Sequence, residues 1–355
     1  MSFIQKLNKG KLDIVGDIHG EYDALLNLLY HLGYNLDGYH PEGRKLVFVG
    51  DLCDRGPDSP AVIYLVAHLV KMGNAQVVLG NHELNVLQNK PKDGGGWFFK
   101  EREPKDTSYE PFARVTERER EIIFEFLNEL PVALENDELR IVHAAWDDES
   151  IDFFRNVKGN KIYPIYKGIE DSINKNNKEN GILDAYHLQK SLWNEEDLNI
   201  KPPFLDDIAN YNLSHQMHNP IRIITSGVEE KAPAPFYTSG KWRFVRRYSW
   251  WDRYEQNIPV VVGHFWRKWE NKENPEVENV FANIEPTSWH GKNNNVFCVD
   301  FSVGGRFKER KNNQELGSTT KLAALSWPER TLTLENGEVI ATSNFEQKTQ
   351  RKNKM

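Results

Sequence analysis

The chain contains little cysteine and no long hydrophobic run. Cys53 and Cys298 are the only cysteines among its 355 residues, so a disulfide framework is excluded and a reducing interior is expected. No segment approaches the roughly 20 apolar residues that cross a bilayer, and the N-terminal residues MSFIQKLNKG lack the apolar core of a signal peptide. These absences predict a globular protein of the cytoplasm.

The chain also has fewer basic residues, 45, than acidic ones, 52. The net charge of −7 at pH 7 argues against a general attraction to nucleic acid or to an anionic membrane, although it leaves a local basic patch open. The hydrophobic content of 39% is enough for one large core or two modest ones.

The chain contains several short apolar runs that are rich in β-branched residues. Each ends in Gly, His or Asp, and each predicts a buried strand. These runs are residues 12–16, 45–50, 76–80, 139–143, 259–263 and 296–300. The stretch LPVALENDELRIVH around the fourth run predicts a β-hairpin.

Helical patterns separate the early runs. Residues 21–32 carry a leucine-rich periodic pattern that stops at Gly33, and residues 60–72 follow Ser59 as the expected cap. A third helix is expected from Thr116, which forms a capping box with Glu119, to about residue 130. Strands alternating with helices and followed by hairpins predict an α/β fold with a mixed sheet.

The rest of the chain is more polar. We expect residues 1–342 to form a single domain that carries a partly helical, cap-like insertion at about 147–222. Residues 267–292 and 305–320 are expected to be loops, and residues 343–355 a disordered polar tail.

The end of each predicted strand carries side chains of the kind that bind metals. The motifs are GDIHG, GDLCDRG, GNHE, IVHAAW and VVVGHFW, which supply Asp17, His19, Asp51, Asp54, Arg55, Asn81, His82, His143 and His264. Any one of them alone has an ordinary explanation, such as a turn, a helix cap, a buried histidine or a surface ion pair. Because carboxyl ends of sheet strands meet along one edge, the set together predicts a metal site.

In this order GDIHG, GDLCDRG and GNHE resemble the calcineurin-like metallophosphoesterases, in the branch that includes phosphoprotein phosphatases. The resemblance covers residues 11–334 and implies a four-layer αββα sandwich of two mixed sheets flanked by helices. The HAAW sequence at residues 143–146 replaces the two glycines usual after this histidine in phosphoprotein phosphatases. It is more similar to bacterial diadenosine tetraphosphate hydrolases and to the phosphatase module of bacterial polynucleotide kinase-phosphatases.

The resemblance implies two divalent metal ions bridged by Asp51. The first ion would be held by Asp17, His19 and Asp51, and the second by Asp51, Asn81, His143 and His264. A hydroxide between the ions would attack the phosphorus. Nitrogen and oxygen donors without thiolate favour Mn, with Fe, Zn or Ni as alternatives.

The resemblance also implies roles beside the metals. His82 would protonate the leaving oxygen while Asp54 orients it. Arg55 would bind phosphate oxygens, in preference to an ion pair with Asp54. Asp300 would either accept a hydrogen bond from His264 or be an ordinary turn residue at a strand end.

Residues 241–254, KWRFVRRYSWWDRY, mix arginine with aromatic residues. They predict either a cleft wall that binds phosphates and a base or a half-buried strand. We take Arg243, from the choice of Arg243, Arg246 and Arg247, as the second phosphate-binding arginine. The glycines at 94–96, followed by Trp97 and Phe98, predict a connector or a mobile rim loop.

Together these features predict an enzyme that hydrolyses phosphate ester or anhydride bonds. Its expected partner is a phosphorylated small molecule or nucleotide, such as diadenosine tetraphosphate. The alternatives are a serine/threonine protein phosphatase, a phosphodiesterase, a nucleic-acid end phosphatase and, last, a metal-binding module without catalysis.

Overall fold

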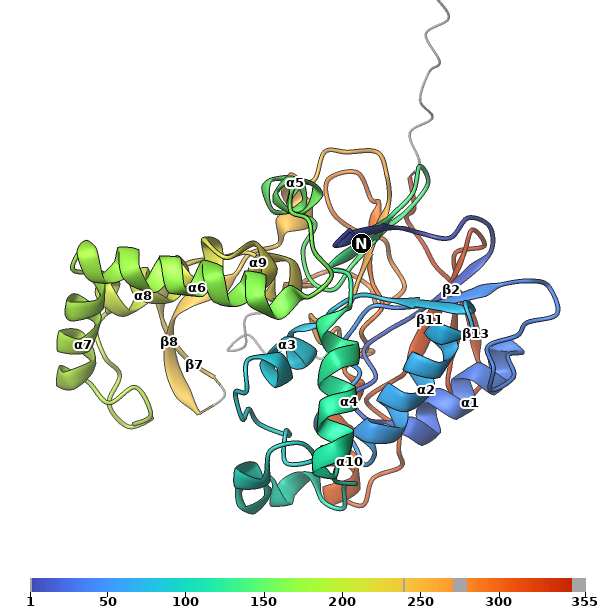
Figure 1. The fold of residues 1–355 in the computed structure, drawn as a ribbon, viewed down its shortest axis with the longest axis horizontal. Coiled ribbons are helices and arrows are strands. Elements are labelled where there is room, and N and C mark those ends of the chain that lie inside the picture. Colours follow the sequence, from blue (N-terminus) through green and yellow to red (C-terminus); the bar gives the residue numbers. More distant parts are fainter. Residues whose placement is uncertain (1, 239, 271–279, 347–355) are drawn as a thin grey trace, which may run out of the picture.

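The computed structural model describes residues 2–238, 240–270 and 280–346. Two mixed β-sheets stacked on each other form its body, and helices cover their outer faces (Figure 1). The fold is therefore the α/β sandwich of two mixed sheets that the sequence motifs imply.

The larger sheet has six strands in the order β13-β12-β11-β2-β3-β4. Strands β2, β3 and β4 are parallel, and β11 joins them antiparallel to β2. Their bounds are β2 Leu12–Val15, β3 Lys45–Phe48, β4 Ala75–Val77, β11 Ala323–Trp327, β12 Thr331–Leu334 and β13 Val339–Ala341.

The smaller sheet has five strands in the order β1-β5-β6-β9-β10. The predicted hairpin is its β5–β6 pair, and β9 and β10 run parallel to β6 and to each other. Their bounds are β1 Ile4–Lys6, β5 Ala133–Glu135, β6 Arg140–Val142, β9 Val260–Val262 and β10 Val296–Cys298.

The two sheets share an apolar core. Leu12 and Ile14 of β2 belong to one buried cluster with Ile141 and Val261 of the other sheet, whereas Val15 belongs to the cluster on the helix side. Successive residues of a strand point to opposite faces. Strands covered on both faces must be apolar throughout, which is why they could be read from the sequence as continuous runs.

Helices α1 (Tyr22–Leu32) and α2 (Ser59–Lys71) cover the larger sheet. Helix α1 ends at Gly33, which has a left-handed φ of 89° as its predicted stop requires. The cap of α2 differs from the expectation: Asp58, not Ser59, accepts a hydrogen bond from the Ala61 amide at 2.9 Å. The Ser59 hydroxyl instead accepts from the amide of Asp54 at 2.9 Å.

The other helices lie around the edges of the sandwich and beside it. The capping box of Thr116 and Glu119 is formed at the start of α4. The α-helical bounds are α3 Asn81–Leu87, α4 Glu117–Asn128, α5 Asp148–Asn156, α6 Ile162–Glu179, α7 Ile182–Leu192, α8 Asp206–Met217, α9 Pro220–Ser226 and α10 Arg306–Lys311. The 3₁₀ helices are η1 Lys100–Lys105, η2 Thr107–Tyr109, η3 Trp250–Arg253 and η4 Val303–Gly305.

An arm extends to one side of the sandwich (Figure 1). It consists of α6, α7 and α8 with the hairpin of β7 (Glu229–Thr238) and β8 (Lys241–Arg247). Helix α8 packs on the hairpin through a separate apolar cluster that includes Ile208, Trp242 and Phe244. The arm thus contains residues of the predicted insertion at 147–222 and also the basic-aromatic stretch that follows it.

Two expectations for polar segments differ from the structure. Residues 305–320 contain the short helix α10. Phe345 of the expected disordered tail packs against Trp289 and Trp327, whereas residues 343, 344 and 346 are exposed. Residues 347–355 of that tail, and 271–279 of the expected loop at 267–292, lie outside the described residues.

None of the helices described in these ranges has the length and apolarity required to cross a membrane.

Candidate metal centre

The residues predicted at strand ends converge on one edge of the two sheets. Asp17 and His19 follow β2, Asp51 follows β3, and Asn81 begins α3 after β4. From the smaller sheet, His143 follows β6 and His264 follows β9. The site is therefore assembled from the carboxyl ends of five strands, a position that favours ligand binding in α/β folds.

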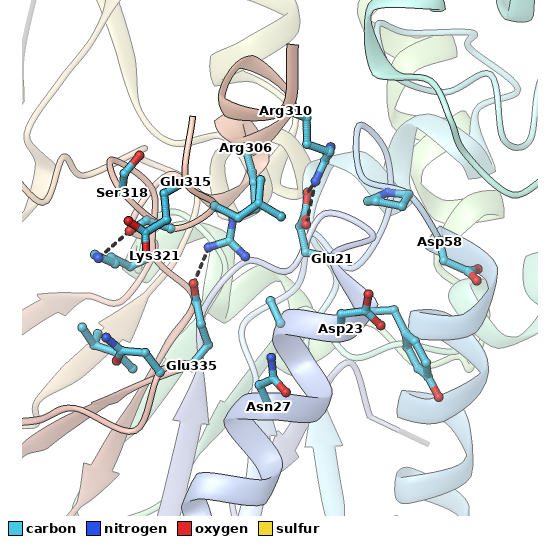
Figure 2. Close-up of a pocket in the computed structure, with 17 residues that line it drawn as sticks. Glu21, Asp23, Asn27, Asp58, Arg306, Arg310, Glu315, Ser318, Lys321 and Glu335 are labelled. Atoms are coloured by element: carbon cyan, nitrogen blue, oxygen red, sulfur yellow. Dashed lines mark hydrogen bonds and ion pairs between the residues drawn. The ribbon is translucent and has the colours of Figure 1, made fainter. Parts of the chain in front are cut away.

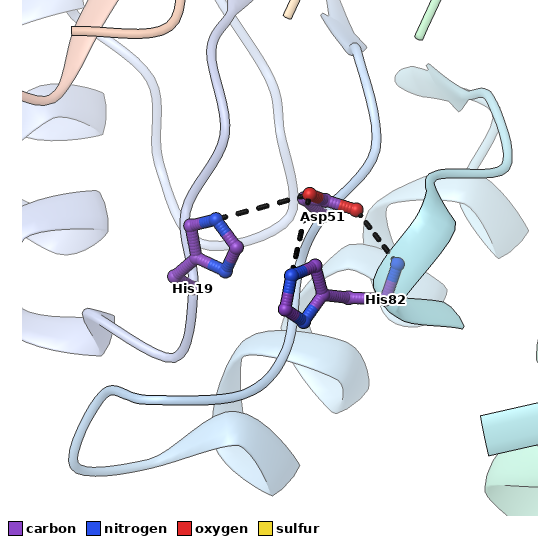
Figure 3. Close-up of side chains that lie close together, drawn as sticks. All are labelled: His19, Asp51 and His82. Atoms are coloured by element: carbon purple, nitrogen blue, oxygen red, sulfur yellow. Dashed lines mark hydrogen bonds and ion pairs between the residues drawn. The ribbon is translucent and has the colours of Figure 1, made fainter. Parts of the chain in front are cut away.

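Asp51 lies at the centre of the cluster. Its Oδ1 is 3.3 Å from Nε2 of His143, and its Oδ2 is 3.8 Å from Nε2 of His19. Figure 3 shows His19 and His82 pointing toward this carboxylate from two sides. Two groups of three residues each have donor atoms that lie within 4.8 Å of one another. They are His19–Asp51–His82 and Asp51–His143–His264, and they share Asp51.

Asn81 and Asp17 complete the cluster. The Asn81 Oδ1 is 2.7 Å from Nδ1 of His264 and 3.2 Å from Nε2 of His143. The Asp17 carboxylate accepts the backbone amide of His264 at 3.0 Å and lies 4.0 Å from Nε2 of His19. All six predicted ligands are thus brought together.

The histidine rings are held by backbone carbonyl groups. Nδ1 of His19 is 3.0 Å from the Cys53 carbonyl oxygen, and Nδ1 of His143 is 2.7 Å from that of Val49. An Nδ1–H that donates to a carbonyl leaves Nε2 as a lone-pair donor, which is the form that binds metals. In both residues Nε2 is the atom that faces Asp51.

The backbone at this edge is strained and closely packed. His19 and Asp51 both have φ of 48°, a left-handed conformation that is uncommon outside glycine and that clusters at functional sites. A Cβ atom at Gly263 would lie 2.0 Å from Oδ1 of Asp17, and one at Gly304 would lie 2.4 Å from Cδ2 of His19. Glycine at these two positions therefore leaves room for the ligand side chains.

The charges of the site are suited to bound cations. Burial raises the pKa of Asp17 well above its ordinary value, and the carboxylates of Asp300 and Asp51 raise it further. Burial alone would also raise the pKa of Asp51, but the charges of His143 and His82 hold it well below its usual range. Among the described residues, neither Asp17 nor Asp51 pairs with lysine or arginine. Buried carboxylates without such a partner are costly, so divalent cations fit this donor set.

A supporting carboxylate, Glu83, had no role in the sequence prediction. Its Oε2 accepts the amides of Asp51 at 2.8 Å and Gly80 at 3.0 Å, and its Oε1 accepts the amide of Leu52 at 2.8 Å. It therefore fixes the loop that carries Asp51. The available signal was its place in GNHE, three residues after the glycine that precedes α3.

His82 lies next to the cluster, and Asp54 binds the ring nitrogen that faces away from it. Its Nδ1 is 2.6 Å from Oδ2 of Asp54, while its Nε2 is 3.9 Å from Oδ2 of Asp51. The indole Nε1 of Trp97 donates to the other Asp54 oxygen at 2.5 Å. The segment expected as a connector or rim loop thus contributes a buried residue to the site, since Trp97 is 2% exposed.

A sequence model of the family described as calcineurin-like phosphoesterase matches residues 10–201 of the chain. This match covers more than half of the protein and includes the first four strand-end motifs. The chain belongs to the calcineurin-like phosphoesterases.

Individual relatives match a shorter part of this phosphoesterase. A bis(5'-nucleosyl)-tetraphosphatase PrpE of Halalkalibacterium halodurans is 55% identical over 75 residues, which are 20% of this chain and 30% of that protein. The PrpE of Bacillus subtilis is 49% identical over 73 residues, again 20% of this chain and 30% of that protein. The alignment therefore spans less than a third of the curated relatives. A cold-active protein-tyrosine phosphatase of a psychrophilic Shewanella is 18% identical in structure-based comparison, with a TM-score of 0.47, and covers 96% of this chain and 82% of that one.

Arg55 of the phosphoesterase is directed to the centre. Its Nη1 is 3.3 Å from Nε2 of His19, and its guanidinium lies 4.7 Å from the ring centroid of Trp266. The alternative of an ion pair with Asp54 does not occur, because Asp54 is engaged by His82 and Trp97. Trp266 follows the proposed ligand His264 by two residues.

The arginines of β8 occupy different positions. Arg247 lies near the centre, because its guanidinium is 5.9 Å from the ring of Phe265. Burial is the main cause that lowers the pKa of His264, and the charge of Arg247 lowers it further. Arg246 pairs with Glu230 at 2.7 Å. Arg243, the arginine favoured from the sequence, lies four residues before Arg247 on β8, opposite Phe236 in the ladder. The geometry therefore favours Arg247 over Arg243 as the arginine near the scissile phosphate.

Asp300 is a turn residue. Its two oxygens accept the amides of Trp266 at 2.7 Å and Ser302 at 2.8 Å. Nε2 of His264 has no hydrogen-bond partner among the described residues, so the suggested contact between Asp300 and His264 is wrong. The residue instead fixes the loop after β9.

A cavity of about 720 Å³ lies away from the metal ligands, between the start of α1 and α10 (Figure 2). Two ion pairs lie in its wall: Glu21 with Arg310 at 2.7 Å, and Arg306 with Glu335. None of the six predicted ligands lines it. This cavity is separate from the candidate centre.

Proposed function

We propose that this phosphoesterase hydrolyses phosphate ester or phosphoanhydride bonds with the help of two divalent cations. The observation that carries the proposal is that six donors from five strand ends form one cluster with the carboxylate of Asp51 at its centre. A structural cation site would not need the His82–Asp54 pair or an arginine such as Arg55 directed to it.

The proposed ligands divide around Asp51. Asp17, His19 and Asp51 would hold one cation, and Asp51, Asn81, His143 and His264 the other. The mixture of imidazole nitrogen with carboxylate and amide oxygen favours Mn, and Fe, Zn and Ni also accept such donors. When bound, two such cations activate a water nucleophile and neutralise charge on the phosphoryl group.

The remaining residues would act on the leaving group and on the non-bridging phosphate oxygens. His82 would give the Nε2 proton to the leaving oxygen, because Asp54 holds the opposite ring nitrogen at 2.6 Å. Arg55 and Arg247 would bind the non-bridging phosphate oxygens through their guanidinium groups. Trp97 would position Asp54 and touch no substrate itself.

The proposed substrate class is nucleotide-like, with diadenosine tetraphosphate as the first candidate. Support comes from the similarity to proteins named bis(5'-nucleosyl)-tetraphosphatase and from Arg247, which ends β8 near the centre. The proposed location is the cytoplasm, which suits the two buried free cysteines.

The test is a substrate panel with protein loaded separately with Mn²⁺, Ni²⁺ and Zn²⁺. We expect hydrolysis of 4-nitrophenyl phosphate, and faster turnover of diadenosine tetraphosphate than of phosphopeptides, end-phosphorylated oligonucleotides or cyclic nucleotides. The Asp51→Asn variant is the control and should lose activity. Inactivity with every metal would contradict the enzyme assignment, and preference for phosphopeptides would contradict the nucleotide substrate.

A further inference from the structure

Strand β8 of the arm directs Trp242 and Phe244 to one face, and Lys241, Arg243 and Arg247 together with Val245 to the other, here called the basic face. Trp242 and Phe244 are buried against α8. Lys241, which precedes Trp242, and Arg243, which lies between the two aromatic residues, are half-buried. Because side chains alternate along a strand, Arg247 lies on the same face as Lys241 and Arg243. Arg246 lies on the other face, where it pairs with Glu230.

The basic face begins near the metal centre and leads away from it. Arg247 contacts Phe265, the residue after the proposed ligand His264. A strand rises about 3.3 Å per residue, so the backbone at Arg243 is about 13 Å and that at Lys241 about 20 Å farther along the arm. A compact phosphate monoester bound at the metals reaches only the first of these residues.

A second segment adds positive charge to this face. The loop after α3 runs beside the hairpin and carries Lys90 and Lys92, both exposed (Figure 1). Burial and the charges of Arg222 and Arg243 lower the pKa of Lys92, which shows that these cations lie within electrostatic reach of one another. Lys92 and Arg243 are 151 positions apart in sequence, so the fold brings them together.

No hydrogen bond or ion pair neutralises these cations in the part of the chain that the structure describes. The side chains of Lys92, Lys241, Arg243 and Arg247 form no hydrogen bond or ion pair there, unlike the paired arginines of the arm such as Arg222. The acidic groups that face them are Glu229, opposite Arg247 in the ladder, and Glu195 near Lys241 and Arg243. Positive charge therefore exceeds negative charge along this face.

We propose that Lys92, Lys241 and Arg243 form a track that binds phosphates lying beyond the one attacked at the metal centre. The substrate would then carry a chain of phosphates, either between two nucleosides or in inorganic form. This inference rests on the proposed function only for the place of the attacked phosphate. Arginine and lysine bind such a chain by charge-assisted hydrogen bonds, and the chain relieves the repulsion among them.

The first test measures kinetics with manganese-loaded protein. The double variant Lys241→Gln/Arg243→Gln should raise KM for diadenosine tetraphosphate at least about tenfold, as expected from losing one or two charge-assisted hydrogen bonds. Its kcat/KM for 4-nitrophenyl phosphate should stay unchanged. Arg246→Gln is the matched control, because it removes a charge from the other face of the same strand and should leave both values unchanged.

The second test measures binding without catalysis. Calorimetric titration of the full chain, after removal of metal by chelation, avoids complexes between metal and probe. Tripolyphosphate should bind more tightly than orthophosphate, and the double variant should lose this preference while Arg246→Gln keeps it. Comparison of tripolyphosphate with diadenosine tetraphosphate distinguishes an inorganic from a nucleoside-linked chain.

The two proposals fail in different ways. If no substrate is cleaved but the titrations behave as expected, the track stands and the proposed function is wrong. If diadenosine tetraphosphate is cleaved and the double variant matches the control in KM and in binding, the track is wrong and the proposed function stands. Circular dichroism of each variant checks that the hairpin still folds.

Discussion

The His82 side chain is where the proposed chemistry can be tested at a single residue. His82→Ala should lower turnover of phenyl phosphate by about 10²–10⁴-fold, because its poor leaving group needs a proton in the transition state. Turnover of 4-nitrophenyl phosphate should fall much less, since that leaving group departs as an anion. Steady-state kinetics on the two esters, together with metal analysis, provide the measurement.

The control for this variant is His187→Ala, which removes an exposed histidine from α7. It should leave both rates unchanged. Equal losses on the two esters in His82→Ala would assign His82 a role other than proton transfer, and a loss of bound metal would place it among the ligands instead.

Trp97 offers a test of positioning. Trp97→Phe keeps the buried ring but removes the N–H that donates to Asp54 at 2.5 Å. A carboxylate that loses such a donor moves or is destabilised by about 1–3 kcal/mol, so kcat for phenyl phosphate should fall about tenfold with KM unchanged. A variant with normal kcat on this ester would show that Asp54 needs no help from the indole.

At the residue scale, the sequence could predict ligands but not their supporters. Asp17, His19 and Asp51 stand at fixed places after apolar runs, so strand recognition alone brings them to one edge. Trp97 is 43 positions from Asp54 and lies in a glycine-rich loop without a periodic pattern. Its contact depends on how the loop folds back over α3. The choice of Arg247 over Arg243 depended likewise on how far β8 extends from the centre.

At the element scale, short strands and helix ends were readable because their chemistry is local. Gly33 ends α1 through its own φ, and Thr116 begins α4 through a bond to a residue three positions on. Ser59 shows the limit. Its hydroxyl was expected to cap α2, but it instead accepts a hydrogen bond from the amide of Asp54 in the preceding loop. The hairpin of the arm was hidden because Pro233 and Pro235 and a register shift interrupt the alternation of β7.

A half-buried ionic network around Glu170 of α6 joins the helices of the arm. Its carboxylate accepts from Arg222 at 2.9 Å and Asn219 at 2.7 Å, and lies 3.0 Å from Nδ1 of His215. Burial would raise its pKa, but the hydrogen bonds from His215 and Arg222 lower it to about 2, from 4.5. One carboxylate therefore ties α6 to α8 and α9.

This network predicts a pH-dependent effect of Glu170→Gln. A carboxyl group whose pKa is lowered by folding adds stability above its unfolded pKa of 4.5, and this stability is lost as the pH falls through about 2. The variant should be less stable than wild type by on the order of 2 kcal/mol at pH 7, and the difference should shrink progressively below pH 4.5. Urea unfolding at pH 7, 5, 4 and 3 measures it.

Glu179→Gln at the exposed end of the same helix is the matched control. Its partner Lys175 lies 3.9 Å away on the surface, and such pairs add little stability. This variant should follow the wild type at every pH. A difference for Glu170→Gln that is constant with pH would show that the network gains its stability from packing rather than from the charge.

At the scale of the whole molecule, strand order was beyond pattern reasoning. Strand β1 pairs with β5 across more than a hundred residues, and β11 returns from the C-terminal part to lie beside β2. Apolar runs identify strands but carry no information about which ones are neighbours. The two-sheet sandwich was expected only through the motif resemblance, whereas the order of predicted strands, helices and hairpins alone favoured an α/β fold with a mixed sheet.

The sandwich also predicts that metal ions contribute to global stability. Because ligands come from both sheets, cations bound to Asp51 would link β3 of one sheet to β6 and β9 of the other. A ligand that binds only the folded state stabilises it by about 2.7 kcal/mol at a free concentration 100 times its Kd. We therefore expect chelation to lower the melting temperature by several degrees, and added Mn²⁺ to restore it. Asp51→Asn should respond much less to either treatment. A melting temperature independent of metal, or an equal response in the variant, would mean that no cation joins the two sheets at this edge.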